Sequence, residues 1–127
     1  MNESVLHAAA LLALWFQEAG SERIESAVTR AMVSTVNLSE AYAKYADKRG
    51  DFAPAQTLFE ASDIQVVAFG EDLAVRAATL RARHPRANLS FADRACLALA
   101  MREDATALTS DKLWSSLAGV GRGEQFR

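Results

Sequence analysis

The chain has 127 residues, half of them hydrophobic and about a quarter charged, which is the balance of a single soluble globular domain over residues 1–127. Its formal net charge of -2 excludes a global attraction to nucleic acid or to anionic membrane. Cys96 is the only cysteine, which excludes an internal disulfide and suits a reducing compartment. The apolar run over residues 6–16 is too short to span a bilayer, and no basic residue precedes it as in a signal peptide. We therefore expect a cytoplasmic protein with no membrane contact.

Short apolar runs alternate with longer amphipathic stretches, and this rhythm predicts an α/β fold with a parallel sheet. In chain order, the expected elements are a strand at 4–6, helices at 8–17 and 22–30, a strand at 32–36, helices at 37–49 and 54–61, a strand at 64–69, helices at 71–83 and 91–102, a strand at 106–108, and a short helix at 111–117. The glycine-rich tail over 119–123 predicts a weak edge strand or a frayed end.

Three of the apolar runs end in a small polar residue, and each is followed by an acid at the start of the next helix: Glu40, Asp93 and Asp111. The carboxyl ends of parallel strands share one edge of the sheet, where open α/β folds build their sites, so we expect these carboxylates to converge. Carboxylates gathered in one place raise each other's pKa unless a cation is present. Their oxygens are the ligands that a hard divalent cation prefers.

Each acid also has a structural explanation. Residues 37–40 and 90–93 both have the spacing of a capping box, and Asp111 could cap its helix or complement the helix dipole. One such acid would be structural more often than functional, but three at successive junctions favour a site. The acidic pair at 71–72 is interpreted as an ordinary first-turn choice.

Three segments resemble motifs of the PIN-domain ribonucleases, and within that family the VapC-type toxins of bacterial toxin–antitoxin pairs. Residues 89–100 (LSFADRACLALA) are similar to the family's third acidic motif, residues 33–40 (VSTVNLSE) to the second, and residues 108–114 (LTSDKLW) to the fourth. They occur in order and at the usual spacing. The resemblance implies a three-layer α/β/α sandwich, with a short parallel sheet of four or five strands and an acidic pocket at its carboxyl edge.

The resemblance also implies a metal-dependent endoribonuclease toxin. Mg²⁺ or Mn²⁺ would be held by Asp93, Glu40 and Asp111, directly or through water, and would lower the pKa of a bound water that attacks phosphorus. A nearby carboxylate would orient or deprotonate that water. Three polar side chains beside the acids would hydrogen-bond the substrate or the carboxylates, or would only cap helices: Asn37, Thr109 and Ser110.

His7 is the one clear departure from the family. There, the first strand ends in an aspartate, usually followed two positions later by Ser or Thr, and here these positions hold His7 and Ala9. Mg²⁺ prefers oxygen ligands, whereas Mn²⁺ or Zn²⁺ tolerates imidazole better. A protonated His7 could also pair with Asp93 or Asp111 and take the place of the cation. We interpret His7 as a disabling substitution, with metal weak or absent. The alternative function is a catalytically silent PIN-like module that captures an antitoxin.

The resemblance implies four relations with partners: a VapB-like antitoxin, an RNA substrate, a homodimer, and DNA reached only through the antitoxin. The expected antitoxin groove lies near Trp15, Phe16 and residues 52–59, where the alternative for each aromatic is core packing. Five further residues are candidates either for the homodimer interface or for the core: Tyr42, Tyr45, Leu73, Ala77 and Leu80.

A basic cluster precedes the Asp93 helix and consists of Arg81, Arg83, His84 and Arg86. With Arg94, it could bring an RNA backbone to the acidic pocket. The alternative, which we slightly favour, is a solvated loop. Cys96 lies in an apolar helix and is expected to be an inert buried thiol.

Overall fold

In the computed structural model, which describes residues 4–109 and 122–125, the strands form one parallel sheet in the order β3-β2-β1-β4-β5. The strands are β1 Ser4–Leu6, β2 Ala31–Ser34, β3 Gln65–Val67, β4 Thr106–Thr109 and β5 Arg122–Gln125. The chain leaves β1 towards β2 and β3 and later returns to the other side of β1. The strand order therefore changes direction between β1 and β4, the place where open α/β sheets form ligand sites.

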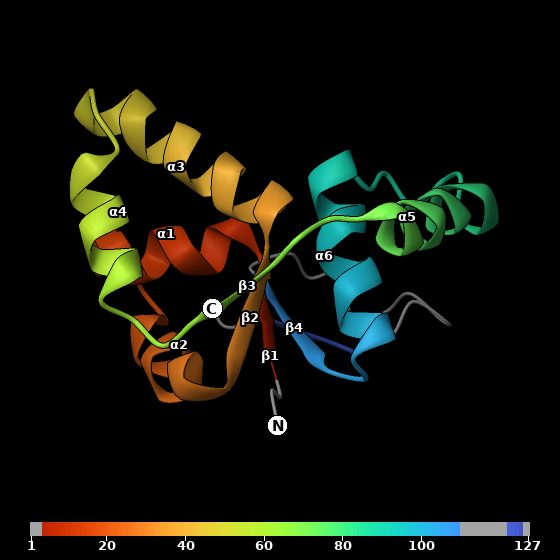
Figure 1. The fold of residues 1–127 in the computed structure, drawn as a ribbon, viewed down its shortest axis with the longest axis horizontal. Coiled ribbons are helices and arrows are strands. Elements are labelled where there is room, and N and C mark those ends of the chain that lie inside the picture. The colour runs from red at the N-terminus through yellow and green to blue at the C-terminus, as the bar shows by residue number, and fades with distance from the viewer. Residues whose placement is uncertain (1–3, 110–121, 126–127) are drawn as a thin grey trace.

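Helices cover both faces of this sheet (Figure 1). They are α1 Ala8–Phe16, α2 Ser21–Ala27, α3 Thr35–Arg49, α4 Ala53–Glu60, α5 Glu71–Arg83 and α6 Phe91–Arg102, with a 3₁₀ turn at Val28–Arg30. The first four helices lie on one side of the sheet, and α5 and α6 lie on the other. The prediction of an α/β fold with helices on both faces of a five-stranded parallel sheet is confirmed.

Successive residues of the central strands pack into two different hydrophobic cores, because side chains alternate between the two faces of a strand. The core beneath α1 and α3 takes Leu6, Val33 and Leu108. The core beneath α5 and α6 takes Val5, Met32 and Ala107. Burial on both faces explains why the middle residues of these strands are apolar and show no polar alternation.

The boundary predicted between the second strand and its helix was wrong. The strand β2 ends at Ser34, and α3 begins at Thr35. Ser34 is the N-cap, because its hydroxyl accepts a hydrogen bond from the Val36 N–H at 3.2 Å. Residues 37–40 therefore lie inside the helix and form no capping box.

The remaining boundaries follow the sequence more closely. Both α5 and α6 have the predicted bounds, and Gly50 ends α3 with φ 83°, a left-handed conformation that suits glycine. The strand β3 is shorter than expected, and the second helix changes to a 3₁₀ turn after Ala27. The edge strand expected in the tail is present as β5. The helix expected at 111–117 lies outside the described residues.

Within residues 4–109 and 122–125, no helix combines the length and apolar character needed to cross a membrane.

Candidate active site

His7 stands directly after β1, at the centre of the carboxyl edge of the sheet. Its backbone N–H donates to the carbonyl of Leu108 in β4 at 3.1 Å, which places it where the strand order changes direction. Its side chain caps α1, because Nδ1 accepts a hydrogen bond from the Ala9 N–H at 3.2 Å. An imidazole nitrogen accepts only when it carries no proton, so this bond assigns the ring proton to Nε2.

Asp93 accepts the hydrogen bond from that second nitrogen. His7 Nε2 lies 2.9 Å from Asp93 Oδ1. The other carboxylate oxygen, Oδ2, accepts from the Ser90 N–H at 2.9 Å, and the Asp93 N–H donates to Ser90 Oγ at 3.0 Å. This is the capping box predicted for residues 90–93. Both carboxylate oxygens of Asp93 are therefore engaged.

The electrostatics of Asp93 favour its charged form. Partial burial raises the pKa of the carboxyl group, but the hydrogen bonds from His7 and Ser90 lower it by more, so the pKa lies below its ordinary value. A neutral His7 with its proton on Nε2 satisfies the contact. The pairing of His7 with Asp93 therefore does not require the protonated imidazole considered from the sequence.

Asn37 and Glu40 lie three residues apart on one face of α3, and each has a buried oxygen with no partner in the part of the chain that the structure describes. Asn37 is fully buried, and its Nδ2 donates to the Ala92 carbonyl at 2.9 Å, which ties α3 to the start of α6 beside Asp93. Asn37 Oδ1 and Glu40 Oε1 are buried and have no hydrogen-bond partner among residues 4–109 and 122–125. Glu40 Oε2 lies 3.6 Å from Lys44 Nζ. Asn37 thus bridges two helices and does not cap one.

Cys96 lies in α6, three residues after Asp93. The thiol is fully buried, and its pKa is raised first by burial and then by the nearby charges of Asp93 and Glu40. The expectation that Glu40 and Asp93 converge at one edge of the sheet, and that they act there as ligands, stays a prediction.

The remaining predicted site residues lie in different surroundings. Thr109 is buried at the end of β4. Arg94 is attached to α5, because its Nη1 donates to the Ala77 carbonyl at 3.3 Å. Its buried Nε has no hydrogen-bond partner within the described ranges 4–109 and 122–125. Ser110 and Asp111 lie outside the described residues.

The side chains at this edge suit a divalent cation only in part. The unpaired oxygens of Asn37 and Glu40 are hard donors, but Asp93 Oδ1 already faces the N–H of His7. Among the residues that the structure describes, no group of three or more His, Cys, Asp or Glu side chains could hold a metal ion. As they stand, the described residues do not fit such an ion.

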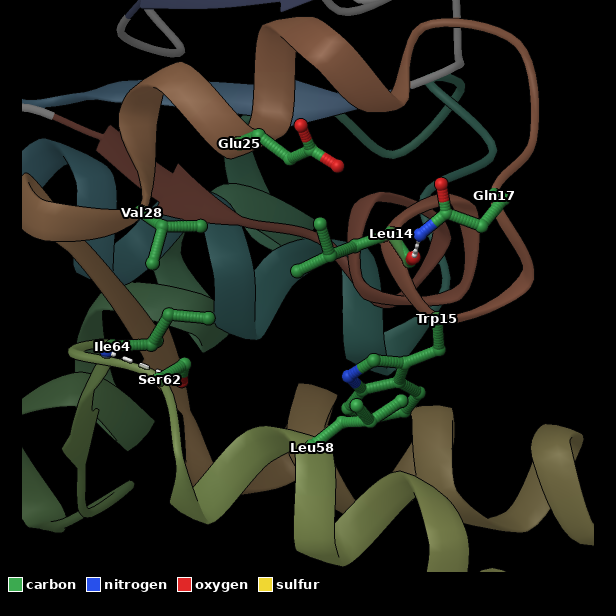
Figure 2. Close-up of a pocket in the computed structure, with 8 residues that line it drawn as sticks. All are labelled: Leu14, Trp15, Gln17, Glu25, Val28, Leu58, Ser62 and Ile64. Carbon is green, nitrogen blue, oxygen red and sulfur yellow. Dashed lines mark hydrogen bonds between the residues drawn. The ribbon is translucent and has the colours of Figure 1, made fainter.

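An apolar pocket of about 310 Å³ lies away from this edge, between α1, α2 and α4. Figure 2 shows Leu14 and Trp15 of α1 facing Leu58 of α4, with Glu25 at the margin. The pocket is lined by Leu14, Trp15, Gln17, Glu25, Val28, Leu58, Ser62 and Ile64. Sequence reasoning missed Leu14, Val28 and Ile64, because apolar periodicity does not show which apolar residues stay beside an opening.

The aromatic anchors expected for an antitoxin groove are mostly internal. Trp15 and Phe59 are only 8% and 7% exposed, so neither is the exposed anchor that the sequence suggested. Phe52 and Leu58 are the exposed apolar residues of this region, at 40% and 52%. The sequence left five residues as candidates for either the core or a homodimer interface, and these also pack inward. Tyr45, Leu73, Ala77 and Leu80 are buried, and Tyr42 stacks on Trp15.

Three solved structures have the same fold along most or all of their length. A toxin–antitoxin complex from Klebsiella pneumoniae matches with a TM-score of 0.79 and 16% identity, covering 98% of each chain. DNA-bound VapBC from Salmonella typhimurium matches with a TM-score of 0.78 and 18% identity over 100% of both chains. VapC20 from Mycobacterium tuberculosis, described as a sarcin–ricin loop cleaving toxin, matches with a TM-score of 0.70 and 19% identity, covering 83% of this chain and 87% of its own. A comparison with curated proteins finds no match.

The fold and the acids at the sheet's carboxyl edge define the class as a PIN-like α/β protein. The family profile of the PIN domain matches residues 5–120, and the chain belongs to this family.

Proposed function

We propose that this chain is a PIN-domain endoribonuclease toxin of a toxin–antitoxin system, with its activity weakened by His7. The observation that carries the proposal is the 2.9 Å hydrogen bond from His7 Nε2 to Asp93 Oδ1, at the edge where Asn37 and Glu40 have unpaired oxygens. Membership of the PIN family and the fold shared with VapC toxins support the nuclease class. The function places the protein in the cytoplasm, with RNA as its substrate.

We expect this chain to bind a divalent metal ion only weakly or not at all. In a PIN nuclease, Mg²⁺ or Mn²⁺ supplies charge neutralisation of the phosphate and acidifies a bound water. Here the imidazole N–H occupies the Asp93 oxygen that a cation would need, so we expect weak or absent metal binding. Asp111 remains the third proposed carboxylate, and Thr109, Ser110 and Arg94 remain proposed substrate or supporting residues.

Exchange of His7 tests the proposal. The His7→Asp variant should cleave RNA in Mg²⁺ or Mn²⁺, EDTA should abolish the cleavage, and the native chain should be much slower. His7→Asn is the matched control, because it keeps a side-chain oxygen for capping α1 but adds no charge. Adding Asp93→Asn to the His7→Asp chain should remove activity while circular dichroism stays unchanged. An inert His7→Asp chain in both metals, across structured and single-stranded RNA, contradicts the nuclease proposal.

The second candidate function is a silent module that captures an antitoxin. The apolar pocket between α1, α2 and α4 favours it, because the pocket does not depend on the state of His7. We propose that an amphipathic segment of a VapB-like antitoxin binds there, with an apolar side chain beside Leu58 and a cation near Glu25. Any contact with DNA would pass through that antitoxin. Homodimer formation remains a separate proposal.

Leu58 allows a direct test of the pocket, because it is 52% exposed and lines the opening. Leu58→Ala should weaken the binding of a cognate antitoxin peptide by about 1 to 2 kcal/mol, measured by calorimetry. Val75→Ala on α5, which is 62% exposed, is the control and should leave the affinity unchanged. Equal affinities for native and Leu58→Ala chains would place the antitoxin surface elsewhere.

A further inference from the structure

Phe91 is a large aromatic side chain left open to solvent beside the candidate site. It is the first residue of α6, two positions before Asp93, and it is 51% exposed. Neither hydrophobic core includes it among its members. Leu89, two residues earlier, is buried and anchors this end of the loop. Phe91 is therefore exposed at the start of α6, although the loop before it is anchored in the core.

Phe69, which follows β3, contacts the ring of Phe91. The two rings meet edge to face, with centroids 5.3 Å apart and planes at 88°. Phe69 is itself held by its N–H, which donates to Thr35 Oγ1 at the start of α3 at 3.2 Å. The aromatic pair thus connects the starts of α3 and α6, which also carry Glu40 and Asp93.

A fixed positive charge accompanies the ring. The guanidinium carbon of Arg94 lies 5.7 Å from the centroid of Phe91. The hydrogen bond of Arg94 to the Ala77 carbonyl keeps the side chain in this place. The basic segment of residues 81–86 leads directly into the loop before α6. An exposed aromatic ring with a guanidinium over it, two residues from a carboxylate, is suited to a nucleic-acid strand and not to an uncharged apolar partner.

We propose that Phe91, supported by Phe69, is the surface on which an unpaired nucleobase of the RNA stacks when the adjoining phosphate lies at Asp93. This inference rests on the proposed function for its substrate class. Stacking on a side chain requires a base that is free of its helix, so the site takes single-stranded RNA or a splayed loop base. Phe91 would then position the substrate without touching the reacting atoms.

RNA binding by the native chain in EDTA tests the inference, because no cleavage interferes. The probe is a fluorescein-labelled single-stranded RNA 12-mer, followed by anisotropy, with a fully abasic ribose-phosphate strand of equal length as the matched ligand. Phe91→Ala should weaken RNA binding roughly ten-fold and leave abasic binding unchanged. Phe91→Trp should bind RNA at least as tightly as the native chain. Val75→Ala on α5, which is 62% exposed, is the control and should change the affinity for neither ligand.

Three results would overturn the inference: unchanged RNA affinity of Phe91→Ala, equal losses for RNA and abasic strands, or a shift in sedimentation to a smaller species without loss of RNA binding. The last result would assign Phe91 to an interface between two copies of the chain. Combined with His7→Asp, Phe91→Ala should raise KM for RNA with little change in kcat. If His7→Asp cleaves RNA and the added Phe91→Ala leaves KM unchanged, the proposed function stands and the stacking site is refuted. If neither chain binds nor cleaves RNA, both are refuted.

Discussion

His7 performs two structural tasks with one ring. Nδ1 caps α1 through the Ala9 N–H, and Nε2 donates to the Asp93 carboxylate, 86 residues further along the chain. A family aspartate at this position would keep the cap and lose the donor. It would also place two carboxylates together, an arrangement that calls for a cation. In this chain, His7 instead supplies Asp93 with a hydrogen-bond donor from within the protein.

The stability of position 7 variants should follow these two tasks. His7→Ala removes both the cap and the donor to a buried carboxylate, and should lower the free energy of unfolding by about 2 to 3 kcal/mol in urea titrations. His7→Asn should cost about 1 kcal/mol or less, since its oxygen can cap α1 and its amide can donate to Asp93. In EDTA, His7→Asp should be less stable than His7→Asn, and Mg²⁺ should stabilise only the aspartate variant. Identical Mg²⁺ responses would remove position 7 from the metal site.

Cys96 should be chemically inert in the folded chain. Burial and the neighbouring carboxylates raise the pKa of its thiol, and the thiolate is the reactive form. A thiol reagent such as DTNB should label less than one tenth of the native protein at pH 8 over an hour, and all of it in denaturant. Rapid labelling of the native state would show that α6 opens locally.

The two helices on the second face are joined by an exposed ion pair. Arg102 Nη1 of α6 donates to Asp72 Oδ2 of α5 at 2.8 Å, and this hydrogen bond is the main reason that the pKa of Asp72 is lowered. A carboxyl group with a depressed folded pKa contributes stability above its unfolded pKa of about 3.9 and loses it as the pH falls through the folded value.

Asp72→Asn should therefore be slightly less stable than the native chain at pH 7, and the difference should disappear as the pH falls below about 4. Because the pair is exposed, 0.5 M salt should also reduce the difference. Glu71→Gln is the control, since it removes a charge from the same helical turn without touching Arg102. Urea titrations from pH 3 to 7 measure both. A difference that grows towards acid pH would contradict the assignment.

The described residues form two hydrophobic cores that share one central sheet, so we expect the two cores to unfold together. Leu11 is fully buried in the core beneath α1 and α3, and Leu97 is buried in the core beneath α6. Leu11→Ala and Leu97→Ala should each cost about 2 to 5 kcal/mol. In both variants, tryptophan fluorescence and far-ultraviolet circular dichroism should report the same urea midpoint. Separate midpoints would mean that one face of the sheet unfolds before the other.

Local sequence signals were sufficient to predict the bounds of a helix wherever capping or terminating residues stand at its ends. The Ser90 to Asp93 capping box set the start of α6, and acidic residues after Gly70 with a proline beyond Arg83 bounded α5. The start of α3 could not be predicted in the same way. Two candidate caps, Ser34 and Asn37, lie three residues apart, and only the packing of Asn37 against the Ala92 carbonyl leaves Ser34 as the cap.

By itself, the sequence determined the α/β class, the parallel sheet, the family and the set of acidic candidates, because these depend on periodicity and on motifs within single segments. Tertiary structure alone decided that His7 pairs with Asp93, that Asn37 bridges α3 to α6, and that Trp15 is internal while Phe91 is open. Each of these depends on which residues of distant segments meet across the sheet. Contacts of that kind follow from strand order and helix packing, which no local pattern encodes.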